Sequence, residues 1–174
     1  MKETLRQGLA EALQLEREGH QYYASLAQET ANPLVRSLFE ELAQDELRHL
    51  ERFEKIYQQV TRDEKPQFET VTGIPLGERM KERFFRLKGS EVRAAEFQKV
   101  AALEKAMEME RESVSLYEER EKGASSDDER GFYRALQKEE YQHLEALENV
   151  HLYLTNPGQW FDLEESKRWN WMNT

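Results

Sequence analysis

Two widely separated parts of the chain carry the same set of residues with metal-binding chemistry. Each set holds two Glu, one Tyr and one His, and a constant offset of 94 relates them: Glu16, Tyr23, Glu46 and His49, then Glu110, Tyr117, Glu140 and His143. One offset shared by four residues indicates an internal duplication. Carboxylates and imidazoles are suitable ligands for iron, manganese and zinc. The sequence therefore predicts a two-metal carboxylate site built from two similar halves.

The spacing within each set explains how a metal would be held. Glu46 and His49 are three residues apart, so on a helix they are surface neighbours and could bind one metal from the same turn. Glu16 would add an oxygen from a facing helix, and the second set repeats this arrangement. A single Glu on a helix is usually solvated, and a single His on an apolar face is usually a hydrogen-bonded core residue. Four inward carboxylates without a metal would leave unpaired buried charge, which favours the metal site.

Two tyrosines and two further histidines need separate interpretation. Tyr23 and Tyr117 each follow the first Glu of their set by seven residues, so they share its helix face. They are either core aromatics or phenols whose hydroxyls bind a ligand carboxylate. His20 is not expected to be a ligand, because the offset of 94 places Val114 opposite it. His151 is expected to be structural.

The candidate ligands lie in segments with the periodicity of long helices. Apolar residues recur every three or four positions over residues 3–30, 33–60, 91–122 and 126–154, which predicts an all-α protein. The turns near residues 32 and 125 are short, so each pair of helices should form an antiparallel hairpin. At about 1.5 Å per residue, the first three ligands all lie roughly 24 Å from their turn. The second hairpin repeats this level, so both ligand groups could meet inside one bundle.

The remaining segments divide the chain. We expect one domain over residues 1–155, made of a hairpin (1–61), a long crossover (62–90) and a second hairpin (91–155). A short helix is expected at residues 76–88. Residues 156–174 form a tail with a second short helix and four large aromatics, Trp160, Phe161, Trp169 and Trp171. These aromatics either cover the end of the bundle or contact a partner.

Composition excludes several classes of protein. The 174 residues have a formal charge of −10 and no basic cluster, which argues against nucleic-acid binding. The absence of Cys excludes disulfides and Cys-ligated metal centres within this sequence. No stretch approaches the roughly 20 apolar residues of a membrane span, and the first residues lack a signal-peptide pattern. We therefore expect a cytoplasmic protein. A homodimer is expected as well.

The repeated pattern, with its long crossover, resembles the rubrerythrin branch of the ferritin-like superfamily over residues 1 to about 155. That resemblance implies a left-handed four-helix bundle with a non-haem di-iron centre. By the same resemblance, Glu46 and Glu140 bridge the two metals. Glu16 and His49 would then complete one metal position, and Glu110 and His143 the other.

The sequence departs from rubrerythrin in two respects. The 174 residues contain no Cys, so a rubredoxin-like domain is absent from them and electrons should come from a separate donor, such as a rubredoxin. Rubrerythrins also tend to carry a further carboxylate one turn after the ligand on the third helix, where this chain has Ser113. The repeat partner of Ser113 is Gly19, and both small residues would leave space near the metals.

Three functions are compatible with these features. The first is an oxidoreductase that uses two iron ions to reduce hydrogen peroxide or O₂, with peroxide favoured by the family resemblance. The second is ferrous iron oxidation followed by storage or transfer. The third is a non-catalytic metal-binding or interaction module that uses the aromatic tail to bind a partner.

Overall fold

The computed structural model describes residues 2–69, 74–80 and 97–160, and this part of the chain is helical without strands. The long helices are α1 (Lys2–Glu29), α2 (Pro33–Thr61), α4 (Phe97–Gly123) and α5 (Asp127–Thr155). The predicted all-α, ferritin-like helical bundle is confirmed. For α1, α2 and α5, the observed ends lie within one residue of the predicted ends.

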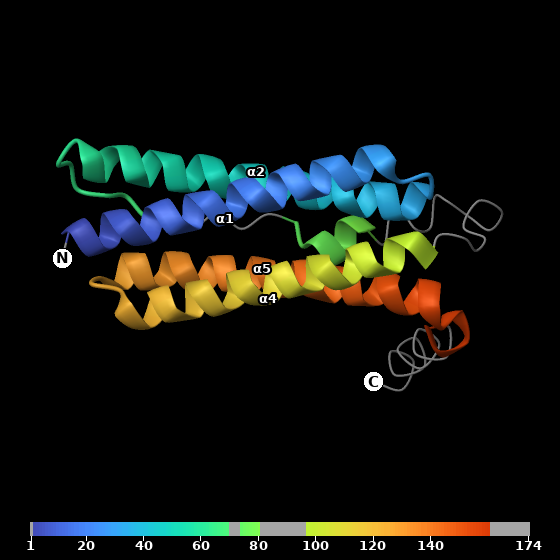
Figure 1. Cartoon of the computed structure of the whole chain (residues 1–174). Coiled ribbons are helices and arrows are strands. Elements are labelled where there is room, and N and C mark those ends of the chain that lie inside the picture. The colour runs from blue at the N-terminus through green and yellow to red at the C-terminus, as the bar shows by residue number, and fades with distance from the viewer. Residues whose placement is uncertain (1, 70–73, 81–96, 161–174) are drawn as a thin grey trace, which may run out of the picture.

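The helices form two antiparallel hairpins whose turns lie at opposite ends of the bundle (Figure 1). The α1–α2 turn is at the right of the view, and the α4–α5 turn is at the left. Because α2 ends at the left and α4 begins at the right, the connection between them must cross the length of the bundle. This arrangement makes α1 antiparallel to α4 and places the middle of each helix at one common level.

Local sequence signals set the helix ends. Asn32 precedes α2 in extended conformation, and its side-chain oxygen accepts hydrogen bonds from the backbone N–H groups of Leu34 (3.0 Å) and Val35 (3.2 Å). Ser126 caps α5 by accepting a bond of 3.1 Å from the backbone N–H of Glu129. These caps satisfy donors that have no partner within the helix.

The end of α2 depends on one residue in the left-handed region. Asp63 has φ 63°, and its N–H donates to the Val60 carbonyl at 3.2 Å. The next N–H, from Glu64, donates to the Gln59 carbonyl at 2.9 Å. This pair of bonds is the Schellman arrangement that ends many helices, and it turns the chain into the crossover.

Two groups of buried apolar side chains lie on either side of the bundle centre. One contains Tyr23, with residues of all four helices and the turn at 76–80, and the other contains Tyr117 with Phe53 and Phe132. The two tyrosines therefore border the central layer from opposite sides. None of the described helices has an apolar stretch long enough to cross a membrane.

The crossover and tail are described only in part. Residues 76–80 are helical, as predicted, with Leu76 and Met80 buried, while the expected remainder of this helix (81–88) and the predicted start of the third helix (91–96) lie outside the described residues. Trp160 packs edge-on against Tyr153, with ring centroids 5.2 Å apart. Phe161, Trp169, Trp171 and the predicted tail helix also lie outside the described residues.

The cap at Asn32 gives a direct test of how the first hairpin is stabilised. Asn32→Ala should lower the free energy of unfolding by about 1 kcal/mol, because two backbone donors lose their acceptor. Urea denaturation measures the change. Asn32→Asp is the matched control, since it keeps a side-chain oxygen and should stay near wild type. An equal loss in both variants would show that the cap is not the cause.

Candidate metal centre

Six charged or ionisable side chains meet in the middle layer of the bundle. Each is at most 4% exposed, and they come from all four long helices: Glu16 from α1, Glu46 and His49 from α2, Glu110 from α4, and Glu140 and His143 from α5. They include every residue predicted as a metal ligand. The six residues, which the spacing from the two turns placed at equal heights, therefore lie in one layer of the bundle.

The donor atoms form two overlapping sets. Glu16, Glu46, His49 and Glu140 offer atoms that lie within 4.8 Å of one another, and so do Glu46, Glu110, Glu140 and His143. Glu46 and Glu140 belong to both sets. Each set contains three carboxylates and one imidazole, which is a suitable donor group for a divalent metal ion.

Both imidazoles direct the same nitrogen towards the centre. Nδ1 of His49 lies 3.1 Å from Glu140 Oε1 and 3.2 Å from Glu16 Oε2. Nδ1 of His143 lies 3.0 Å from Glu140 Oε2, 3.3 Å from Glu46 Oε1 and 3.5 Å from Glu110 Oε2. The two rings are stacked, with centroids 5.9 Å apart.

The other imidazole nitrogens bind a second pair of carboxylates. Nε2 of His49 lies 2.8 Å from Glu139 Oε2 on α5, and Nε2 of His143 lies 3.2 Å from Asp45 Oδ2 on α2. An N–H donated to a carboxylate fixes the ring orientation and leaves Nδ1 available to a metal. Neither residue was predicted to contact the site. The offset of 94 also relates Asp45 to Glu139, so the repeat could have identified them as a further pair of acidic residues.

The two phenols cross between the hairpins. The Tyr23 hydroxyl, on α1, donates to Glu110 Oε1 on α4, and the Tyr117 hydroxyl, on α4, donates to Glu16 Oε1 on α1. Each phenol therefore binds a carboxylate of the opposite helix and not the Glu of its own helix. In both carboxylates the second oxygen, Oε2, faces the histidine of its set.

In the absence of a metal ion, burial strongly perturbs the carboxylates. Burial, with smaller contributions from Glu140 and Glu46, raises the pKa of Glu110 to about 8 despite the opposing effect of His143. Burial and the charge of Glu46 raise the pKa of Glu16 well above its ordinary value. Burial acts to raise the pKa of Glu140 too, but His49 and His143 outweigh it and lower the value to about 2.

The neighbouring carboxylates also raise the pKa values of both imidazoles. Burial favours their neutral forms, but nearby carboxylates raise both pKa values well above the ordinary 6.5: Glu16 and Glu140 act on His49, and Glu110 and Glu140 act on His143. Without a metal, the centre therefore compensates its negative charge by holding protons.

The residues present fit a metal ion. Both carboxylate oxygens of Glu140 and Nδ1 of His143 are buried without a hydrogen-bond partner among the described residues. Buried polar atoms of native proteins are nearly always paired. Here Glu140 Oε2 and His143 Nδ1 lie 3.0 Å apart without the geometry of a hydrogen bond, inside an acidic layer where a cation would satisfy them.

Two further histidines, His20 and His151, lie outside both sets. His20 Nδ1 lies 2.8 Å from the backbone carbonyl of Ala43, and His151 Nε2 lies 3.5 Å from Glu104 Oε1. Neither residue belongs to either group of possible metal ligands in the described part of the chain.

Fold and site together define an all-α, ferritin-like bundle with a buried carboxylate and histidine centre suited to metal ions. The family model described as Rubrerythrin matches residues 8–151, which include all six candidate ligands and both phenols. The chain belongs to the rubrerythrin family. Comparison with curated proteins and with solved structures gives no match.

The raised pKa of Glu110 predicts how the stability of the metal-free protein depends on pH. Between the ordinary value of 4.5 and about 8, the folded protein holds a proton that the unfolded chain has released. The free energy of unfolding should therefore fall as pH rises through this window. The raised pKa values of the histidines act in the same direction above 6.5.

Urea denaturation after removal of metal by chelation measures this dependence. Glu110→Gln should flatten the profile, because its amide does not titrate, while Glu148→Gln at an exposed position of α5 should leave it unchanged. A metal-free wild-type protein whose stability rises between pH 4.5 and 8 would contradict the assignment.

Proposed function

We propose that the protein is a non-haem di-iron oxidoreductase that reduces hydrogen peroxide, or O₂, with electrons from a separate donor. The observation that carries the proposal is the pair of overlapping donor sets that share Glu46 and Glu140. In the proposed centre these two residues would contribute donor oxygens to both metal ions. Glu16 and His49 would hold one ion with them, and Glu110 and His143 would hold the other. Membership of the rubrerythrin family supports iron, although manganese or zinc would accept the same donor atoms.

Two ferrous ions held here would supply two electrons, which together with two protons from solvent reduce hydrogen peroxide to two water molecules. The four carboxylates carry the charge needed to neutralise two divalent ions inside an apolar bundle. The Tyr23 hydroxyl donates to one oxygen of Glu110, and the Tyr117 hydroxyl donates to one oxygen of Glu16. The other oxygen of each carboxylate stays directed at the centre. Asp45 and Glu139 hold the imidazole rings by their outer nitrogens.

The repeat positions Gly19 and Ser113 are both small. A Cβ atom placed on Gly19 would lie 3.4 Å from Cγ and Cδ of Glu46, an ordinary van der Waals contact, so glycine leaves a gap no larger than a methyl group beside that carboxylate. Its repeat partner Ser113 is also buried. We propose that these small residues favour a small oxidant, hydrogen peroxide or O₂, over a larger substrate.

The electrons should come from another molecule. The 174 residues contain no Cys, so a Cys-ligated iron centre cannot lie within them. A rubredoxin is a suitable donor. We further propose that the protein acts in the cytoplasm as a homodimer.

Stopped-flow oxidation of the ferrous protein tests the reaction. Anaerobic protein loaded with two equivalents of iron is mixed separately with hydrogen peroxide and with O₂, and the absorbance of the oxidised centre is followed. We expect oxidation by peroxide to be the faster reaction and well above the rate for free ferrous iron. Faster oxidation by O₂ with repeated turnover of added iron would favour ferrous iron oxidation instead. Rates equal to those of free iron with both oxidants would exclude both activities.

A matched pair of variants on α5 tests the site itself. Glu140→Gln should weaken metal binding more than about 10-fold, since even residues that only support ligands are worth 10–100-fold. Glu148→Gln is the control, because Glu148 is exposed and pairs with Arg111. Metal analysis and calorimetric titration measure both proteins. Unchanged stoichiometry and affinity in Glu140→Gln would remove Glu140 from the centre.

A further inference from the structure

The two carboxylates that support the imidazoles have cationic partners of different origin. Glu139 is bound by Arg52 of α2, whose Nη1 lies 3.2 Å from Oε1 and 3.3 Å from Oε2. Asp45 is bound by Arg79, which lies in the short helical turn of the crossover at residues 76–80. The repeat does not account for Arg52, because the offset of 94 places the buried Ala146 opposite it. The carboxylate behind His49 is therefore held from a long helix, and the carboxylate behind His143 is held from the crossover.

Arg79 bridges two carboxylates on one face of α2. Its Nη1 donates to Glu41 and its Nη2 to Asp45, and these acceptors are one helical turn apart. The side chains of Arg79, Glu41 and Asp45 are 22%, 13% and 7% exposed. Hydrogen bonds between charged groups are stronger than neutral ones, and partial burial limits screening by salt. Arg79 thus attaches the crossover to α2 through two charged hydrogen bonds.

The same turn is also anchored by apolar contacts. Leu76 and Met80 are 1% and 8% exposed and belong to the core cluster that contains Leu42 and Ala43 of α2. The position of Arg79 is therefore fixed by its neighbours on both sides. Arg48 contacts the other oxygen of Asp45, but it lies on α2 itself and its side chain is 48% exposed. Arg79 is the described residue that links Asp45 to the crossover.

We infer that Arg79 is a positioning residue for the metal site at His143, and that it couples docking of the crossover turn to metal binding. The inference rests on the proposed metal centre. Arg79 fixes Asp45, Asp45 fixes the His143 ring through Nε2, and the ring presents Nδ1 to the centre. The equivalent path to His49 runs through Glu139 and Arg52, within the long helices. Loss of Arg79 should therefore affect one metal position and spare the other.

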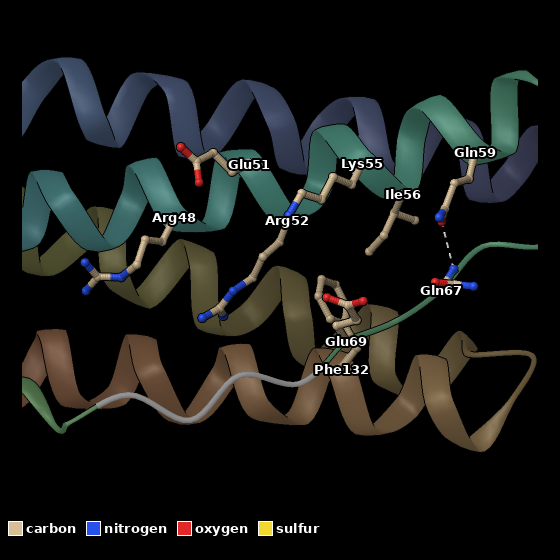
Figure 2. A pocket seen from close by; sticks show the side chains of 9 residues that line it. All are labelled: Arg48, Glu51, Arg52, Lys55, Ile56, Gln59, Gln67, Glu69 and Phe132. Carbon is tan, nitrogen blue, oxygen red and sulfur yellow. Dashed lines mark hydrogen bonds between the residues drawn. The ribbon is translucent and has the colours of Figure 1, made fainter.

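Figure 2 shows the face of α2 that carries Arg48 and Arg52. There, Arg48, Arg52 and Lys55 line a pocket of about 230 Å³ together with Gln67, Glu69 and Phe132. Arg52 points from α2 towards α5, where its partner Glu139 lies. Arg52 is therefore the natural counterpart for comparison with Arg79.

Calorimetric titration with Zn²⁺ tests the selectivity. Arg79→Gln is measured in two backgrounds that each keep one imidazole, His49→Ala and His143→Ala. We expect it to weaken Zn²⁺ binding about 10-fold or more when His143 is present, and to have little effect when only His49 remains. Arg52→Gln should give the reverse pattern. Arg79→Lys should restore part of the affinity, and Arg111→Gln, in an exposed ion pair, should do nothing.

Several outcomes separate this inference from the proposed function. If wild-type protein binds no Zn²⁺, iron or manganese, the metal centre itself is wrong. If wild type binds metal but Arg79→Gln has the same effect in both backgrounds, or none, only the role of Arg79 is overturned. Circular dichroism verifies that each variant is folded, and His→Asn versions replace any alanine variant that is not.

A spin label tests the coupling to the crossover. The chain has no Cys, and a Cβ atom at Gly77 would meet nothing within 4 Å, so Gly77→Cys gives a single labelling site on the turn. Because coupling between two events is reciprocal, diamagnetic Zn²⁺ should reduce the mobility of the label. The effect should be lost in Gly77→Cys/Arg79→Gln. A label that does not respond to Zn²⁺, or responds equally in both proteins, would contradict the coupling.

Discussion

The structure depends on the burial of four carboxylates in one layer of a narrow helical bundle. Glu16, Glu46, Glu110 and Glu140 are each at most 4% exposed, and moving a single carboxylate out of water costs several kcal/mol. Two imidazoles compensate only part of this charge, so the layer must hold either protons or cations. The raised pKa values of Glu110 and His49 correspond to the first solution, and the buried atoms of Glu140 and His143 that make no hydrogen bond indicate the second.

The duplicated hairpin allows such a layer to form without a large irregular cavity. Because the two turns lie at opposite ends of the bundle, α1 is antiparallel to α4, and residues at equal distances from their turns meet in the middle (Figure 1). The same antiparallel arrangement brings Tyr23 to Glu110 and Tyr117 to Glu16. These hydrogen bonds tie the two hairpins together at the level of the site. An apolar cluster on each side then separates the layer from the ends of the bundle.

The symmetry of the site decreases with distance from its centre. The six candidate ligands, the two phenols and the outer carboxylates Asp45 and Glu139 all obey the offset of 94. The cations do not, because Arg79 comes from the crossover and Arg52 has no arginine at its repeat position. The two donor sets, which contain the same kinds of side chain, therefore have different surroundings. Such differences alter how firmly each ligand is held, even when the ligands themselves are alike.

The sequence by itself determined the helices, the hairpins and the six residues of the central layer. These features follow from short-range rules: residues three or four apart share a helix face, a short turn makes neighbours antiparallel, and equal spacing from a turn gives equal height. The limits of α1, α2 and α5 were predicted from the local recurrence of apolar residues, and in the structure Asn32 and Ser126 cap α2 and α5.

Only the tertiary structure decided which residues act across the bundle. Spacing placed Tyr23 on the face of Glu16, yet its hydroxyl binds Glu110, because the facing helix and not the same helix supplies the nearest carboxylate. The partners of the outer imidazole nitrogens, and the contact of Arg79 with Asp45, likewise depend on the rotation and height of separate elements. A sequence pattern states which residues share a face. The packing of one face against another determines the contacts that orient the site.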